Sequence, residues 1–157
     1  MAVKPIPDGY HTVTPYLIIQ GAAKALDFYK KALGAKELFR MASPDGRIGH
    51  AEILVGDSHI MLADEHIERG AKSAKTLGGT PIGICLYVQD VDAWFDRAVT
   101  AGATVMYPVK DQFYGDRSGT IVDPFGLMWT IATHKEDVPP DELGRRAAAA
   151  MKDGGCG

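Results

Sequence analysis

Two polar side chains in one short strand-like segment offer the clearest chemistry in this sequence. His50 and Glu52 lie two residues apart in G-H-A-E-I-L-V, so on a strand they share a face. An imidazole beside a carboxylate can transfer protons. We expect Glu52 in a partly apolar cup to have a raised pKa, which suits abstraction of a proton next to a carbonyl. The alternatives are a hydrogen-bonded structural glutamate and a pair at a solvated strand rim.

Further histidines extend this chemistry to a metal site. His59 and His134 belong to the strand-like segments S-H-I-M-L-A-D and L-M-W-T-I-A-T-H, on the faces shared with Met61 and Thr130. Two imidazoles and one carboxylate would suit Fe, Mn, Ni or Zn. The spacing matches no known metal motif, and no cofactor is predicted unless such a site forms.

A third candidate is anion recognition by the segment Q-F-Y-G-D-R. Arg117 can hold a carboxylate or phosphate through two parallel hydrogen bonds, and Tyr114 lies beside it. The alternative is an ion pair of Arg117 with Asp116 or Asp123 that only fixes the loop.

The elements that must position these residues occur twice. A strand (14–20), a helix (22–33) and three strands (35–41, 46–55, 58–64) are followed by a strand (82–88), a helix after Asp90, and three more strands (103–109, 118–122, 127–133). Leu17 and Leu86, like Gln20 and Gln89, are 69 positions apart. The pattern predicts an α+β fold with two βαβββ modules forming a cup-shaped mixed sheet, and residues 139–152 predict a C-terminal helix.

Strand alternation sorts the side chains between a helix-facing side and an open face. Gly56-Asp57 predicts a two-residue turn, which places Glu52 opposite Met61. Trp129 falls on the helix side, and Cys85, without a basic neighbour, is expected to fill space. Tyr16 and Tyr87, which we expect to be equivalent across the repeat on the open face, are suited to stacking on a flat ligand. The predicted pocket is lined by Tyr16, His50, Glu52, Met61, Cys85, Tyr87, Tyr114, Arg117 and Thr130.

Composition restricts the partners. The chain has 157 residues and a formal net charge of −3, with no basic stripe, so we expect neither nucleic acid nor a membrane as partner. The N-terminus resembles no signal peptide, and Cys85 and Cys156 are the two cysteines. We expect a cytoplasmic protein without a disulfide framework that binds a small molecule.

Several motifs resemble those of the vicinal oxygen chelate superfamily, the glyoxalase, bleomycin-resistance and dioxygenase group. V-T-P-Y-L-I, A-L-D-F-Y, L-Y-V-Q-D-V-D and Q-F-Y-G-D-R-S-G-T-I-V-D-P-F-G-L-M-W look closest to its PhnB-like branch. The resemblance covers residues 10–135 as one domain, with modules at about 11–64 and 82–134 and an exposed, mobile linker at 65–81. It implies a homodimer with a ligand cup.

The resemblance also indicates which residues would hold a metal. The positions that match the metal ligands of the metal-dependent members are Thr14, Met61, Gly83 and Thr130. Hydroxyl and thioether groups are poor ligands for a hard divalent ion, and glycine has no side chain. Leu127 also replaces a histidine common in the branch. We therefore expect metal-independent binding of a small molecule; a lyase, isomerase or dioxygenase with a site rebuilt around His50 and Glu52 is the alternative.

Overall fold

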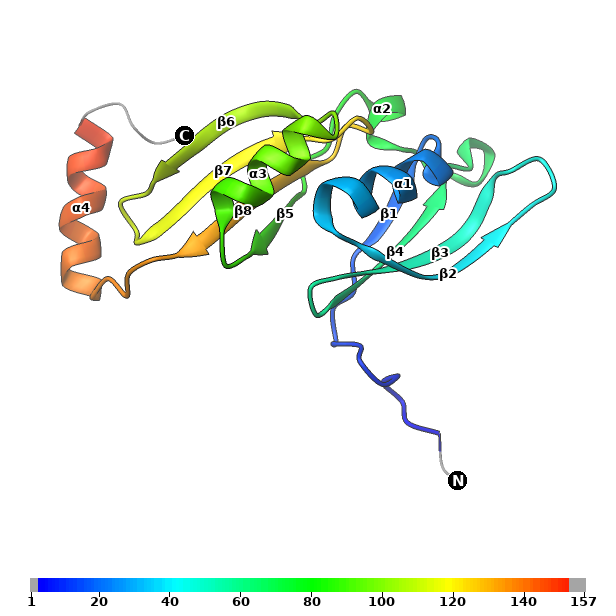
Figure 1. The fold of residues 1–157 in the computed structure, drawn as a ribbon, viewed down its shortest axis with the longest axis horizontal. Helices are drawn as coiled ribbons and strands as arrows, with labels where there is room; N and C mark the ends of the chain where they lie inside the picture. Colours follow the sequence, from blue (N-terminus) through cyan, green and yellow to red (C-terminus); the bar gives the residue numbers. More distant parts are fainter. Residues whose placement is uncertain (1–2, 153–157) are drawn as a thin grey trace.

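The computed structural model describes residues 3–152, and these form two modules of the same design (Figure 1). Cys156 lies outside the described residues. The first module consists of β1 (Tyr16–Ile19), α1 (Ala22–Leu33), β2 (Lys36–Ala42), β3 (Ile48–Val55) and β4 (Ser58–Asp64). The second consists of β5 (Gly83–Tyr87), α3 (Val91–Thr100), β6 (Thr104–Asp111), β7 (Asp116–Val122) and β8 (Met128–His134). The predicted α+β fold with two βαβββ modules is confirmed.

Each module contains one four-stranded mixed sheet. The strand orders are β1-β4-β3-β2 and β5-β8-β7-β6, with β1 parallel to β4 and β5 parallel to β8. The other neighbouring strands are antiparallel. Gly56 has φ +60°, as a tight two-residue turn requires, and the resulting register pairs Glu52 with Met61 as predicted.

The two long helices α1 and α3 begin and end where local signals place them. The Asp90 side chain accepts a hydrogen bond from the Ala93 amide at the start of α3. Gly34 adopts the left-handed conformation, φ +61°, that ends α1. Both helices lie side by side over one face of the sheets (Figure 1), and Leu26, Tyr29 and Trp129 are fully buried between the layers.

Asp123, in the D-P-F-G turn between β7 and β8, connects the modules. Its Oδ2 accepts hydrogen bonds from the Tyr29 hydroxyl of α1 at 2.7 Å and from Trp129 Nε1 at 2.9 Å. Its Oδ1 accepts from the Phe125 and Leu127 amides, both at 2.9 Å. Burial, followed by the Asp123 charge, raises the pKa of Tyr29, so its hydroxyl stays a donor. Trp129 therefore belongs to the core, as predicted.

Most residues of the linker between the modules are exposed, as we expected, but the linker also contains regular structure. It contains a 3-10 helix, η1 (Ile67–Arg69), and one turn of helix, α2 (Ala74–Leu77). Ser73 is fully buried and accepts a hydrogen bond from the Thr76 amide. A capped turn that buries its first residues has few alternative conformations, and glycine and lysine composition does not reveal such packing.

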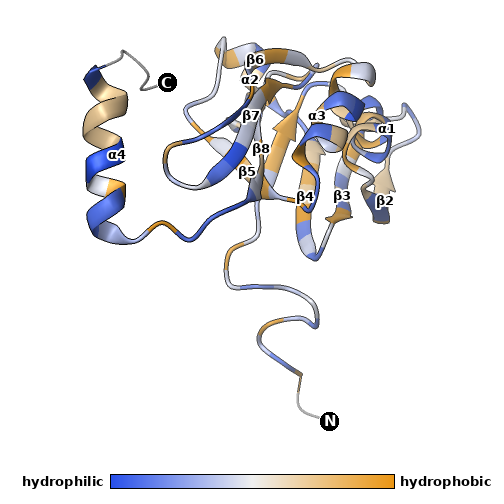
Figure 2. Ribbon diagram, turned by 60° about the vertical axis from the view of Figure 1, so that its left-hand side comes forward, coloured by the Kyte–Doolittle hydropathy of each residue, from blue (hydrophilic) through white to orange (hydrophobic). Residues whose placement is uncertain are grey.

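The C-terminal helix α4 (Pro140–Lys152) projects away from both sheets and has no buried residue (Figure 2). Arg146 holds it to the preceding segment through an ion pair with Glu136, and it also pairs with Glu142 within the helix. No helix within residues 3–152 is long and apolar enough to cross a membrane.

Candidate functional site

The open face of the first sheet centres on the Glu52 carboxylate. Glu52 Oε1 lies 3.1 Å from His50 Nε2, and the Tyr10 hydroxyl donates a short hydrogen bond to Oε2. On the far side of the imidazole, His50 Nδ1 lies 3.0 Å from the Tyr16 hydroxyl. Two aromatic hydroxyls, an imidazole and a carboxylate thus form one chain of hydrogen bonds, and three of its four members were predicted.

These contacts reverse the predicted shift of the Glu52 pKa. The Tyr10 hydrogen bond and then the His50 hydrogen bond lower the pKa of Glu52, and together they outweigh the effect of burial. The same contact with Glu52 raises the pKa of Tyr10 to about 12. The expectation of a raised Glu52 pKa was wrong, because it counted only the apolar surroundings. Glu52 is an ionised hydrogen-bond acceptor at neutral pH, and it is a weaker base than we expected.

Tyr10 comes from an N-terminal segment that crosses the open face. A cavity of about 590 Å³ separates this segment from the sheet and is lined by Pro5, Ile6, Pro7, Tyr10, His11, Thr12, Thr14, Glu52 and Met61. The Tyr10 ring stacks on the His59 ring, with 4.1 Å between centroids. Sequence reasoning missed Tyr10 because it precedes the first strand, where no periodicity assigns it to a face.

Replacing Tyr10 with Phe tests the contact that controls the Glu52 charge. The variant keeps the ring on His59 but removes the hydroxyl, so the Glu52 pKa should rise toward its ordinary value. A carboxyl-detected NMR titration measures this shift, and Tyr114→Phe, on the other module, serves as the control. A Glu52 pKa that is the same in Tyr10→Phe and the parent would contradict the assigned contact.

Asp116 organises a second polar cluster, on the open face of the other sheet. Its Oδ2 accepts a 2.8 Å hydrogen bond from the Tyr87 hydroxyl, and its Oδ1 lies 2.8 Å from His134 Nδ1. The other ring nitrogen of His134 lies 3.0 Å from Asp137 Oδ1. Asp116 is buried, whereas Tyr87 and His134 are exposed. Sequence reasoning considered Asp116 only as a loop partner of Arg117.

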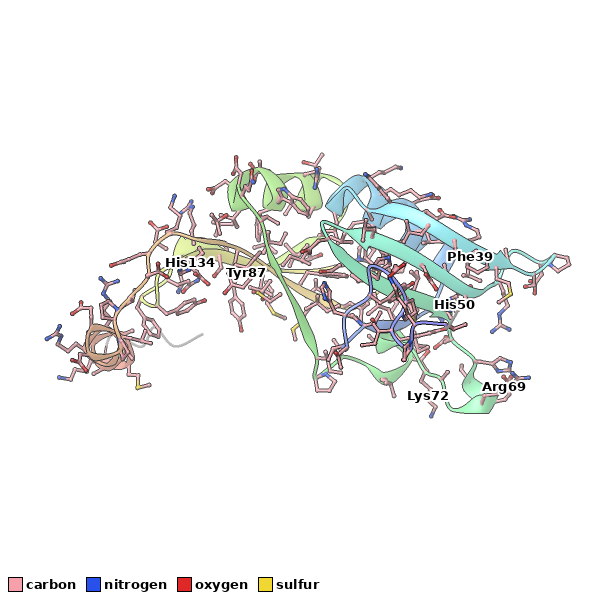
Figure 3. The ribbon with its side chains drawn as sticks, turned by 90° about the horizontal axis from the view of Figure 1, so that it is seen from below. Phe39, His50, Arg69, Lys72, Tyr87 and His134 are labelled. Carbon is pink, nitrogen blue, oxygen red and sulfur yellow. The ribbon has the colours of Figure 1, made fainter. Side chains whose placement is uncertain are left out.

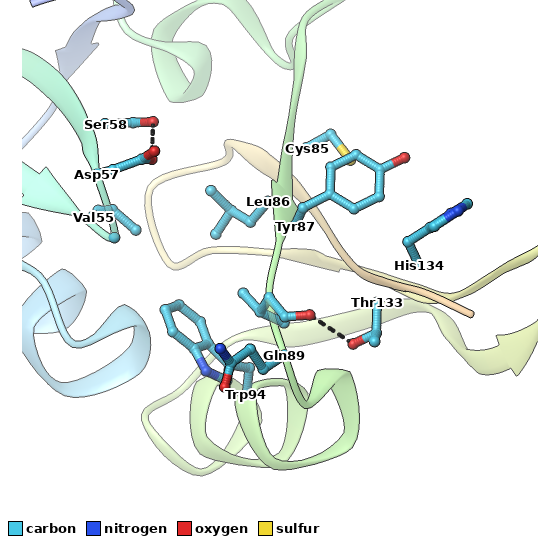
Figure 4. Close-up of a pocket in the computed structure, with 12 residues that line it drawn as sticks. Val55, Asp57, Ser58, Cys85, Leu86, Tyr87, Gln89, Trp94, Thr133 and His134 are labelled. Carbon is cyan, nitrogen blue, oxygen red and sulfur yellow. Dashed lines mark hydrogen bonds between the residues drawn. The ribbon is translucent and has the colours of Figure 1, made fainter. Parts of the chain in front are cut away.

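A groove of about 910 Å³ passes this cluster along the edge of β5 (Figure 4). Cys85, Tyr87 and His134 line it, together with Trp94 and the turn at Gly56-Asp57. Burial and then the Asp116 charge raise the pKa of the Cys85 thiol, which supports a space-filling rather than a nucleophilic role.

Replacing Asp116 with Asn tests the second cluster. The contacts with Asp116 and then Asp137 raise the pKa of His134, so the variant should lower it. A raised folded-state pKa stabilises the fold at low pH, and this contribution is lost as the pH rises through that value. A histidine-labelled NMR titration follows the ring directly. Asp111→Asn, which removes a carboxylate on another surface, should leave His134 unchanged; an equal shift in both variants would contradict the assignment.

Arg117 lies away from both clusters. Its guanidinium makes two hydrogen bonds to the Asp92 carboxylate of α3, at 2.8 and 2.9 Å, and one to Asp111 at 3.2 Å. Strand alternation explains this placement, since Asp116 and Ser118 face the open side and Arg117 between them faces the helix side. Arg117 therefore forms ion pairs, as the alternative to anion recognition predicted. Its partners are Asp92 and Asp111 and not Asp116 or Asp123, which we had named.

The predicted lining residues fall into two groups rather than one. Tyr16, His50, Glu52 and Met61 lie on the first sheet, whereas Cys85, Tyr87 and Thr130 lie on the second and Tyr114 lies in the turn between β6 and β7. Figure 3 shows His50 and Tyr87 on these two separate sheets. The Thr130 hydroxyl lies 2.9 Å from the Thr120 hydroxyl, and the Tyr114 hydroxyl lies 3.4 Å from the Ser118 hydroxyl. The register also shows that Cys85 is the counterpart of Tyr16, since they pair with Thr130 and Met61. Tyr87 is not that counterpart.

The arrangement within one chain provides no complete metal centre. Within residues 3–152 no three His, Cys, Asp or Glu side chains are grouped so that they could hold a metal ion. His50 and Glu52 lie together, but His134 belongs to the other sheet. Thr14 and Met61, two of the positions that the resemblance assigns to metal ligands, line the Glu52 cavity.

Two βαβββ modules with polar clusters on their open faces define the class of protein, and comparison with known proteins identifies the family. Residues 10–131 match the family model described as the Glyoxalase/Bleomycin resistance protein/Dioxygenase superfamily. The chain belongs to this superfamily.

Individual relatives extend over most of the chain. The uncharacterized protein Mb0911c of Mycobacterium bovis is 43% identical over 148 residues, covering 92% of this chain and 95% of its own. The solved Arabidopsis thaliana At5g48480 product has a TM-score of 0.64 at 27% identity, covering 78% of this chain and 98% of its own. A Bacillus cereus PhnB protein, described as a putative 3-demethylubiquinone-9 3-methyltransferase, has a TM-score of 0.63 at 14% identity, with coverages of 78% and 99%.

Proposed function

We propose that this chain is a cytoplasmic small-molecule-binding protein of the PhnB-like kind, with its ligand site on the open face of the first module. The observation that most supports this function is the cavity beneath the N-terminal segment, where Glu52 meets aromatic and apolar walls. Its volume of about 590 Å³ is in the range of about 300–1,000 Å³ typical of ligand pockets. A few polar groups in an apolar concavity are the usual composition of such sites.

The chemistry of the four matched ligand positions supports binding without a metal. Thr14, Met61, Gly83 and Thr130 offer two hydroxyls, a thioether and no carboxylate or imidazole. The Glu52 carboxylate, opposite Met61 in the strand register, accepts a hydrogen bond from Tyr10 and lies beside His50. In this proposal the polar chain orients a ligand, and Glu52 and His50 are its principal contacts.

We further propose that a second copy of the chain completes the binding cup. Large apolar side chains remain uncovered on both open faces: Phe39 and Met41 beside His50 and Glu52, and Tyr87 and Tyr107 on the second sheet. Exposed large apolar side chains on a sheet face often mark a protein interface. A homodimer that places the first module of one copy against the second module of its partner would combine the two groups of predicted lining residues in one cup.

The proposal is tested by metal analysis of protein purified without a chelator or an affinity tag. We expect substoichiometric transition metal in the parent and the same trace level in Glu52→Ala. Stoichiometric metal that is lost in Glu52→Ala would overturn metal-independent binding. It would favour the alternative, a metal-dependent lyase, isomerase or dioxygenase with a site built around His50 and Glu52.

A further inference from the structure

The cavity beneath the N-terminal segment contains a carboxylate without a fixed cationic partner. Its lining residues include Glu52 but no lysine or arginine. Within residues 3–152, the ion-pair partner of Glu52 within 4.0 Å is the His50 imidazole. Arg117, the arginine predicted for the ligand site, lies on the helix side of the second sheet, where Asp92 and Asp111 already neutralise it.

The hydrogen bond from Tyr10 leaves the negative charge of the Glu52 carboxylate in place. The Tyr10 hydroxyl donates a hydrogen bond and carries no charge, and the Glu52 contact, followed by burial, raises the pKa of this phenol to about 12. About 23% of the Glu52 side chain is exposed, so the charge is only partly hydrated. A partly desolvated carboxylate attracts an opposite charge more strongly than one in bulk water.

The walls of the cavity suit an organic rather than an inorganic cation. Pro5, Ile6 and Pro7 provide an apolar side, and the Tyr10 ring provides a flat one, held in place by stacking on His59. A hard divalent ion usually takes several charged oxygen ligands, whereas Glu52 is the single carboxylate in the lining that residues 3–152 provide. An aromatic ring and a carboxylate together are a common receptor for ammonium groups.

From these contacts we propose that the cavity binds a small organic cation, whose protonated amine pairs with Glu52 while its apolar body lies between Pro5–Pro7 and Tyr10. This inference rests on the proposed binding function and adds the chemical class of the ligand. It assigns residues 5–14 to the ligand site as a wall. It also disfavours anions such as phosphonates as ligands, because, among the described residues, no lysine or arginine lines the cavity.

Three matched probes test the charge preference. 2-Phenylethylamine, 2-phenylethanol and phenylacetate share an aromatic body and differ in charge at neutral pH. Isothermal titration should show the amine binding about tenfold or more tightly than the other two, as a charge-assisted contact predicts. Glu52→Gln should abolish this difference, whereas Glu68→Gln, an exposed carboxylate outside the cavity, should preserve it.

A salt titration of the parent protein gives a second measurement that needs no variant. The amine should bind more weakly as sodium chloride is raised, while the alcohol should be insensitive. Equal affinities of the three probes, tighter binding of phenylacetate, or a preference that survives in folded Glu52→Gln would each overturn the inference. Absence of binding by the amine would overturn it as well.

The failure of this inference is distinguishable from that of the proposed function. If the alcohol or phenylacetate shifts the NMR signals of His50 and His59 as strongly as the amine, the cavity binds small molecules but does not select cations. If no compound of any charge shifts these signals, the binding function itself is wrong.

Discussion

Replacing Asp123 with Ala is expected to lower the free energy of unfolding by about 3–5 kcal/mol. The variant removes the acceptor of the buried Tyr29 hydroxyl and Trp129 indole, and of two turn amides. Donors left buried without partners cost more than the net value of the bonds that are lost. Because Tyr29 belongs to α1 and Asp123 to the second module, the loss should weaken the packing between the modules.

Urea denaturation at equilibrium measures this effect, with Asp96→Ala as the matched control. Asp96 is exposed on α3, so its replacement should change the stability by less than about 0.5 kcal/mol. Tyr29→Phe removes a single hydrogen bond to Asp123 and should cost about 1 kcal/mol. If Asp123→Ala were as stable as Asp96→Ala, the turn would not connect the modules as described.

Replacing Phe39 with Glu is expected to weaken self-association about a hundredfold or more. Phe39 is half exposed on the open face, opposite Glu52 in the strand register, so a second copy on this face would bury the new charge beside an existing one. Burying a carboxylate without a cationic partner costs several kcal/mol. Sedimentation equilibrium across a dilution series measures the dissociation constant.

A matched variant places the same charge on the helix side of the molecule. Val99 is exposed on α3, so Val99→Glu should leave the association unchanged. A parent protein that stays monomeric throughout the dilution series would refute the proposed dimer. Equal weakening by the two variants would instead place the interface away from the open face.

Periodicity and turn chemistry were sufficient to predict the layers of the fold. The range 22–33 for the first helix coincides with α1, because apolar spacing defines its body and Gly34 its end. The turn at Gly56-Asp57 fixed the pairing of Glu52 with Met61, because a one-residue slip would turn every side chain to the other face. The two-residue spacing of His50 and Glu52 on this strand likewise predicted that their side chains are neighbours on one face.

Contacts between segments far apart in the sequence could not be predicted in this way. Tyr10 reaches Glu52 across 42 positions, and Arg117 meets Asp92 across 25, along paths set by loops rather than by a repeating pattern. The direction of the Glu52 pKa shift was mispredicted for the same reason. Strand alternation indicated the apolar surroundings of Glu52, but it could not reveal the Tyr10 hydroxyl that donates to it. Asp123 of the D-P-F-G turn was considered only as an ion-pair partner of Arg117, yet it serves the core.

The most direct test of the central claim is a titration of histidine-labelled protein with a fragment mixture of cationic, neutral and anionic aromatic compounds, in excess EDTA. The account predicts that at least one compound shifts the His50 and His59 signals saturably, because both rings adjoin the Glu52 cavity. It also predicts that His66, in the linker, remains unshifted. Shifts of His50 and His59 that arise only after a divalent metal is added, or no shifts with any compound, would contradict metal-independent binding at this site.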